Sequence, residues 1–165
     1  MQEQGKKEIR DLLVNTKIRK IMTTEVHAVD ENAYLSKAEE LLTGYELTHV
    51  PVVDKNKFVV GLLSHMYVYK TQAPRPFVEG ELVTSPDVVI DGNAFYLKET
   101  LDKHLLKNVM KKNPLTLNSE ESLAVAIHAM ANKRIGCIPV VDDRRMLVGI
   151  ITNQDIINFL ALMMS

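Results

Sequence analysis

Thr152 and Asp155 stand three positions apart in the stretch GIITNQD (149–155), where an apolar strand is expected to end and a helix to begin. A hydroxyl at this point can bond a phosphate or sugar oxygen, and a carboxylate one turn later can accept two hydrogen bonds from a ribose diol. Gly149 lets a ligand approach the backbone, and the helix start favours phosphate through free N–H groups and a partial positive charge. We therefore predict a nucleotide-type site around Thr152 and Asp155.

The same pair has a second interpretation that needs no ligand. A hydroxyl residue followed three positions later by an acid is close to a capping box, in which two side chains bond the backbone N–H groups at a helix start. Spacing alone does not separate the two roles, and we expect Thr152 to serve in both.

The stretch GLLSHMY (61–67) resembles GIITNQD but ends in Tyr67 where the other ends in Asp155. A shift of 88 positions aligns the chain with itself without a gap, which indicates a duplication. Matching pairs include Met22 with Met110, Leu35 with Leu123, Ala38 with Ala126, PVVD 51–54 with PVVD 139–142, and Gly61 with Gly149. Because tyrosine does not offer the acceptors of a carboxylate, we expect one competent site and one degenerate site.

Each copy predicts the element order βαββα. A short extended piece precedes a helix with apolar residues at helical spacing, and two β-branched strands (HVPVV and FVVGLL; CIPVV and MLVGII) flank a charged turn. The strands are almost wholly apolar, which favours a sheet covered by helices. A unit of roughly 50 residues leaves much apolar surface uncovered, so we expect the copies to pack face to face about a pseudo-twofold axis. The predicted fold class is α/β.

The predicted organisation is an N-terminal helix (1–17), a first repeat (18–70), a long inter-repeat linker (71–105) and a second repeat (106–165). The linker begins rich in proline and turn residues and is expected to run over the surface. The stretch DGNAFYLKETLDKHLLKNVM (91–110) then predicts a helix that leads into repeat two, capped near Asp91 or Asn93. Segments of this length are sometimes functional, but a plain connector is commoner.

These residues resemble the tandem cystathionine-β-synthase (CBS) domain family, whose paired units are called a Bateman module. The matching features are the M-x-x opening, the P-V-V-D strand and the G-h-h-[ST]-x-x-D junction, twice and in family order, over about residues 18 to 160. The resemblance implies a non-catalytic regulatory module that binds AMP, ADP, ATP, S-adenosylmethionine or a cyclic dinucleotide in clefts between the repeats. It also implies that occupancy is relayed to a partner protein and that modules pair as homodimers.

The resemblance assigns residues to two clefts. The first cleft is expected to use Thr152, Asp155, Val26, His27, Ala28, Thr48, His49, Pro51 and Ile150. Backbone groups of 26–28 and 47–51 would recognise the adenine edge, with His49 near the phosphates. The second, weaker cleft is expected to use Ser64, Tyr67, Leu115, Gly136, Cys137 and Pro139. There Tyr67 would stack on a base or pack against proline or leucine.

Composition argues against several other classes of protein. A formal charge of −1 gives no general attraction to nucleic acid or anionic membranes. No stretch approaches the ~20 apolar residues of a membrane span and no signal peptide is evident, so we expect a soluble, cytoplasmic protein. The single cysteine, Cys137, excludes an intrachain disulfide and is expected to be buried rather than nucleophilic.

Catalysis and metal binding are not expected. The five histidines lack metal-ligand spacing, and the sequence shows no nucleophile–base pair and no Walker-type loop. The alternative function is a ligand-free adaptor for protein interaction or dimerisation. Its apolar surface, or else further core, would come from the closing helix, at Leu160, Leu162, Met163 and Met164.

Overall fold

The computed structural model describes residues 2–65, 68, 75–76, 88–91 and 94–164. The chain forms two compact units. Unit 1 consists of residues 1–26, 55–59 and 114–165, and unit 2 consists of residues 27–54 and 60–113.

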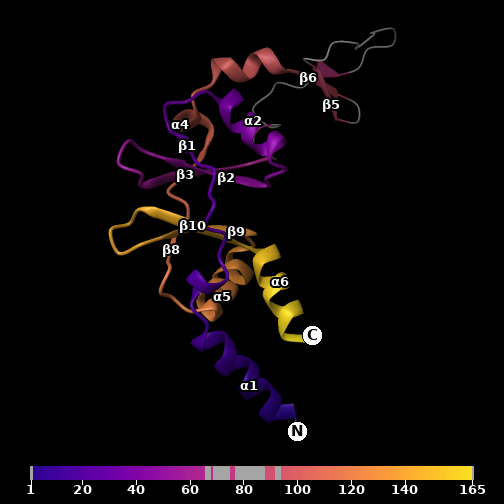
Figure 1. The fold of residues 1–165 in the computed structure, drawn as a ribbon. Helices are drawn as coiled ribbons and strands as arrows, with labels where there is room; N and C mark the ends of the chain where they lie inside the picture. The colour runs from indigo at the N-terminus through magenta and orange to yellow at the C-terminus, as the bar shows by residue number, and fades with distance from the viewer. Residues whose placement is uncertain (1, 66–67, 69–74, 77–87, 92–93, 165) are drawn as a thin grey trace. The chain divides into compact units, whose positions relative to one another are not determined.

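Unit 1 contains a three-stranded sheet and three α-helices (Figure 1). Its elements are α1 (Gln2–Asn15), η1 (Ile18–Lys20), β8 (Leu117–Asn118), α5 (Leu123–Lys133), β9 (Cys137–Val141), β10 (Leu147–Thr152) and α6 (Asn153–Met164). Strand β9 lies in the middle, parallel to β8 and antiparallel to β10. Figure 1 shows α5 and α6 on one side of this sheet.

The core of unit 1 forms between α5 and the sheet. Leu123, Ala126 and Met130 recur at intervals of three and four residues, which places them on one helix face. They pack with Ile138 of β9 and Ile151 of β10 in one buried cluster. Helix α6, by contrast, has no buried residue. The apolar residues of the closing helix predicted as core or partner surface are therefore exposed at Leu160, Leu162, Met163 and Met164.

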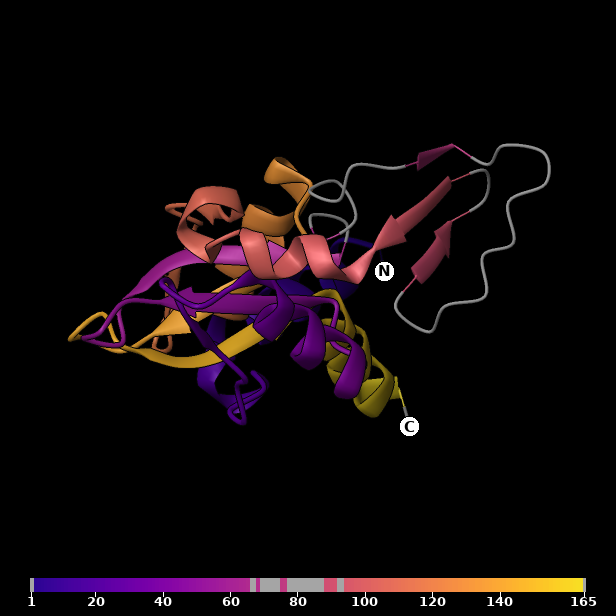
Figure 2. The same cartoon turned by 90° about the horizontal axis from the view of Figure 1, so that it is seen from above.

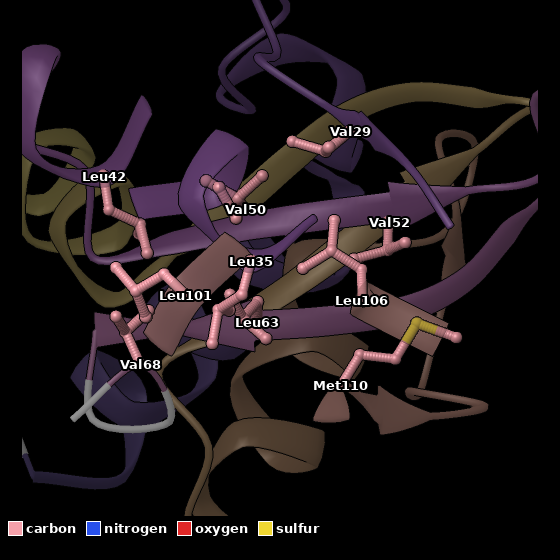
Figure 3. Close-up of a cluster of buried hydrophobic side chains, with 11 residues drawn as sticks. Val29, Leu35, Leu42, Val50, Val52, Leu63, Val68, Leu101, Leu106 and Met110 are labelled. Atoms are coloured by element: carbon pink, nitrogen blue, oxygen red, sulfur yellow. The ribbon is translucent and has the colours of Figure 1, made fainter. Parts of the chain in front are cut away.

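Unit 2 is built on a four-stranded sheet with the order β1-β2-β3-β7. Its elements are β1 (Val29–Asp30), α2 (Leu35–Gly44), β2 (His49–Val53), β3 (Val59–Ser64, which starts at the unit boundary), β4 (Arg75–Pro76), β5 (Val88–Asp91), β6 (Ala94–Leu97), η2 (Lys98–Lys103), α4 (Leu106–Val109) and β7 (Lys111–Lys112). Figure 3 shows its core, in which Leu35 and Leu42 of α2 gather with Val50, Leu63 and Leu106.

The predicted duplication is confirmed by the element bounds. Strands β1, β2 and β3 recur as β8, β9 and β10 with both ends shifted by 88 positions, and α2 and α5 begin at equivalent leucines. The order βαββα is complete in the second repeat. In the first repeat, the closing helix is described only at His65 and Val68. The α/β class predicted from the sequence is correct.

The repeats exchange their leading segments. Thr23 lies in the leading segment of the first repeat, which precedes β1, and it pairs with Ile150 of β10. Strand β7 lies in the leading segment of the second repeat, which precedes β8, and it pairs with Gly61 and Leu62 of β3. The two pairings are equivalent under the 88-residue shift. Each compact unit therefore contains segments of both repeats. The predicted ranges 18–70 and 106–165 divide the chain by its sequence repeats. The compact units divide it by contacts between residues, so their bounds differ from those ranges.

The helix predicted over residues 91–110 is wrong in its first part. Ala94–Leu97 is strand β6, which pairs antiparallel with β5 from Asp91↔Ala94 to Val88↔Leu97 and with β4 on its other edge (Figure 2). Two apolar runs separated by Gly-Asn are a hairpin signal, and the aromatic pair in AFYL favours a strand. Helical structure begins only with η2 and α4. The predicted surface course of residues 71–87 lies, apart from β4, outside the described residues.

Candidate functional site

Thr152 and Asp155 are placed by the junction between β10 and α6. Ile151 is fully buried in the core and anchors the end of the strand, so that Thr152 is held at the point where α6 begins. Asp155 follows in the first turn of the helix. Both residues are half-buried, which leaves part of each open to solvent.

The two residues form a capping box. Asp155 Oδ2 accepts hydrogen bonds from the backbone N–H of Thr152 at 2.7 Å and from the Thr152 hydroxyl at 2.6 Å. In return, the backbone N–H of Asp155 donates to Thr152 Oγ1 at 3.2 Å. The capping interpretation of this motif is therefore correct. The ligand role of the same residues stays a prediction.

Asp155 has a further partner that the sequence did not indicate. The hydroxyl of Thr23 donates to Asp155 Oδ1 at 3.1 Å. Thr23 is fixed by its backbone, because its N–H and C=O exchange two hydrogen bonds of 2.9 Å with Ile150. In the sequence, the one signal for Thr23 was its position directly after Met22 in the leading segment. That position does not identify Asp155 as its partner.

The N–H groups at the start of α6 are less available than the sequence suggested. The N–H groups of Thr152 and Asp155 serve the capping box, and that of Asn153 donates to the carbonyl of Gly136 at 3.0 Å. The expectation of free N–H groups for a phosphate is therefore wrong for these three residues. The helix dipole still favours negative charge at this end.

The space beside Gly149 is filled by the chain itself. A Cβ added to Gly149 would lie 2.6 Å from Met22 Sδ and 3.0 Å from the carbonyl oxygen of Thr23. The close approach that this glycine permits is thus made by the leading segment. The predicted approach of a ligand to this face of the residue is not available while Met22 occupies it.

The other residues predicted for the first cleft divide between the units. Val26 and Ile150 belong to unit 1 with Thr152 and Asp155. The remaining five residues belong to unit 2 and are His27, Ala28, Thr48, His49 and Pro51.

In unit 2 the His27 ring stacks on Tyr45, with ring centroids 3.9 Å apart and an interplanar angle of 27°. His49 Nδ1 lies 3.0 Å from Thr48 Oγ1, and burial lowers the pKa of His49. Pro51 is buried in β2, whereas Ala28 and Thr48 are exposed. The ligand role of these five residues stays a prediction.

The second predicted set is similarly divided. Leu115, Gly136, Cys137 and Pro139 belong to unit 1 and Ser64 to unit 2. The prediction for Tyr67 lies outside the described residues.

Residues of the two predicted sets are neighbours across the β9–β10 ladder. Pro139 pairs with Ile150, and Cys137 pairs with Thr152. The predicted burial of Cys137 is correct, because its side chain is only 2% exposed. Burial, and next the charge of Asp155, raise the pKa of the Cys137 thiol to about 12. Any contact of Cys137 with a ligand would therefore come from its backbone.

Two negative findings concern the described residues only. Among them, no three or more histidine, cysteine or acidic side chains come together as a metal site. Within the same part of the chain, no helix has the length and apolar character needed to cross a membrane.

The CBS domain model matches this sequence twice, over residues 18–71 and 106–162. The chain belongs to the CBS domain family. A homoserine O-acetyltransferase of Methanococcoides burtonii is 27% identical over 148 residues, which are 90% of this chain and 25% of that protein. The chain thus spans about a quarter of the length of such curated relatives.

Solved CBS pairs share the fold. The CBS domain pair of protein MJ0100, in complex with 5′-methylthioadenosine and S-adenosyl-L-methionine, has a TM-score of 0.67 at 21% identity and covers 90% of this chain and 98% of its own. CBSX2 in complex with AMP has a TM-score of 0.69 at 20% identity and covers 92% of this chain and 100% of its own. At these identities the likeness establishes the fold.

Proposed function

We propose that this chain is a regulatory CBS module that binds an adenosine-containing small molecule and relays its occupancy to a partner protein. The observation that carries the proposal is the half-buried Asp155 carboxylate at the start of α6, held in a fixed orientation by Thr152. A carboxylate in such a place can accept hydrogen bonds from the hydroxyls of a ribose, as acids do in dinucleotide-binding folds.

The ligand class is supported by what the related structures contain. The MJ0100 pair was solved with 5′-methylthioadenosine and S-adenosyl-L-methionine, and CBSX2 with AMP. These ligands share adenosine and differ in the group at the 5′ position. Recognition through the sugar suits this chain, because three N–H groups that could hold a phosphate at α6 are already engaged. The ribose would therefore be the principal point of contact with Asp155.

A regulatory role is supported by the length of the relatives. Curated relatives named homoserine O-acetyltransferase are about four times as long as the segment that this chain matches. A segment of that kind fits a sensor attached to, or acting on, a separate catalytic domain. The regulated protein and the homodimer both stay predictions. Exposed apolar residues of α6, such as Ile157 and Met164, suit either contact.

One observation favours a second candidate, a ligand-free adaptor. Both oxygens of the Asp155 carboxylate already have partners within the chain, at Thr152 and Thr23. Such a carboxylate satisfies the helix start without any ligand. The two functions differ in whether a small molecule stabilises the folded chain.

Thermal unfolding with a panel of adenosine compounds separates the two candidates. The panel contains adenosine, AMP, ATP, 5′-methylthioadenosine and S-adenosylmethionine, each added to the wild type, to Asp155→Asn and to Asp11→Asn. Asp11 is an exposed acid of α1 in the same unit and serves as the control. Because Asp155→Asn also alters the helix cap, each shift is measured from the ligand-free Tm of the same variant.

The sensor proposal expects a rise in Tm with at least one compound, retained in Asp11→Asn and largely lost in Asp155→Asn. At a concentration of ~100 Kd, a ligand specific for the folded state contributes about 2.7 kcal/mol, which is readily measured. No rise with any compound would favour the adaptor. Mass spectrometry of small molecules released from gently purified protein would identify a co-purified ligand directly.

A further inference from the structure

Three donors already occupy the Asp155 carboxylate, and they divide unequally between its oxygens. Oδ2 accepts two hydrogen bonds from Thr152, at 2.6 and 2.7 Å. Oδ1 accepts one longer hydrogen bond of 3.1 Å from the hydroxyl of Thr23. An ionised carboxylate offers about four acceptor positions in all. Oδ2 is therefore fully used, and Oδ1 has about one position left.

A ribose diol presents two hydroxyl donors to a carboxylate. With Thr23 in place, Oδ1 can accept one of them, and the second would have to displace the Thr23 hydroxyl. The backbone of Thr23 cannot withdraw without breaking its two hydrogen bonds to Ile150. Its side chain is exposed and belongs to the chain itself, so it is present at Asp155 whatever the ligand concentration.

Thr23 is not needed to orient the acid. The two bonds from Thr152 are shorter and fix the position of Oδ2, and Thr152 is part of the same helix start. Loss of the Thr23 hydroxyl would therefore free an acceptor position without releasing the side chain of Asp155. We therefore expect the Thr23 hydroxyl to compete with a sugar hydroxyl for Asp155 Oδ1, and not to support the orientation of the acid.

The positions equivalent to Thr23 and Asp155 under the duplication support the same interpretation. Under the 88-residue shift, Thr23 corresponds to Lys111 and Asp155 corresponds to Tyr67. The hydroxyl and the acid thus belong to different repeats but to the same compact unit, and both are replaced at the equivalent positions, which belong to the other unit. A hydroxyl in the leading segment accompanies the acid that it contacts.

We propose that Thr23 is a specificity-determining residue, which competes with the sugar for Asp155 Oδ1 and so limits how strongly the site prefers ribose to 2′-deoxyribose. The inference rests on the proposed function, because it concerns the ligand of the same carboxylate. Without the Thr23 hydroxyl, both sugar hydroxyls bond the acid. A 2′-deoxy sugar, which has one hydroxyl fewer, gains nothing from the change.

The test uses Thr23→Val, which keeps the β-branched shape suited to an extended segment, and Thr23→Ser, which keeps the hydroxyl. Calorimetric titration measures the Kd of adenosine and AMP and of their 2′-deoxy forms. One additional hydrogen bond corresponds to roughly a fivefold change in Kd. We expect Thr23→Val to bind the ribose forms about fivefold more tightly, and the 2′-deoxy forms with unchanged Kd.

The decisive readout is the Kd of the 2′-deoxy form divided by the Kd of the ribose form. It should rise about fivefold in Thr23→Val and stay at the wild-type value in Thr23→Ser, whereas a general loss or gain of folding would move both Kd values together. An unchanged ratio in Thr23→Val, in protein that binds AMP, would overturn the role of Thr23 and leave the proposed function intact. If adenosine and AMP bind neither the wild type nor either variant, this inference fails, and the proposed function fails with it only if ATP, 5′-methylthioadenosine and S-adenosylmethionine do not bind either.

Discussion

The side chain of Met22 occupies the space beside the Cα of Gly149. A Cβ at Gly149 would meet Met22 Sδ at 2.6 Å and the carbonyl oxygen of Thr23 at 3.0 Å, and contacts under 3.0 Å are essentially never seen for a real Cβ. The equivalent pair, Met110 and Gly61, makes the same contact in unit 2. A methionine from each leading segment thus packs on a glycine in the last strand of the other repeat.

Gly149→Ala is expected to destabilise the protein by about 1–3 kcal/mol, the usual cost of an overpacked core. The flexible Met22 side chain can move, but the Thr23 carbonyl is tied to Ile150 by a hydrogen bond. Urea unfolding followed by circular dichroism measures the loss.

Two controls belong to this prediction. Gly44→Ala, at the end of α2, has no atom within 4 Å of the added Cβ and should lose no stability. The double variant Met22→Ala, Gly149→Ala should lose less than the sum of the single variants, because the smaller side chain makes room. Equal stability of Gly149→Ala and the wild type would contradict the assignment of this contact.

Thr152→Ala is expected to lower the free energy of unfolding by about 1 kcal/mol, because it removes the N-cap of α6. The loss should appear in the complete absence of ligand. Ser122→Ala is the matched control, because Ser122 is the N-cap residue of α5 but makes no side-chain capping hydrogen bond. Chemical denaturation of both variants compares the two caps. Equal losses would show that the Thr152 capping box does not stabilise the helix.

Most of the fold could be predicted because it is encoded in local patterns that occur twice. Leu35 and Ala38 define the buried face of α2, and Leu123 and Ala126 define that of α5, all with no exposed surface. The exchange of leading segments was not predicted, since pairing such as that of Thr23 with Ile150 leaves no periodic trace in either segment. The β5–β6 hairpin was missed because the predicted helix, which is supported by the residues after the hairpin, was begun too early and included AFYL.

In the candidate site, too, local contacts could be predicted from the sequence and long-range contacts could not. The bond between Thr152 and Asp155 spans three residues, and its capping role could be stated from spacing alone. The bond from Thr23 to Asp155 spans 132 residues and depends on how the backbone folds. A side chain at such a distance becomes a candidate only once the strand pairing is known.

The Cys137 thiol is expected to be unreactive in the folded protein. Burial and the charge of Asp155 raise its pKa to about 12, so the thiolate is scarce at pH 8, and the side chain is only 2% exposed. Reaction with Ellman's reagent at pH 8 should be slow for the native chain. In 6 M guanidinium chloride the reaction should be complete within minutes, at about the rate of an ordinary exposed thiol. Fast stoichiometric reaction of the native protein would contradict the burial of β9.

His49 is expected to make the stability of the protein fall as the pH falls below about 6.5. Burial lowers the pKa of His49, so the folded chain favours the neutral ring and the unfolded chain takes up the proton first. The stability from the neutral ring is therefore fully present above the unfolded pKa and is lost as the pH falls toward the folded pKa. Urea midpoints at pH 7.5 and 5.5 should differ less in His49→Gln than in the wild type. The exposed His128→Gln is the control, and an equal reduction in that variant would show that His49 is not the group responsible.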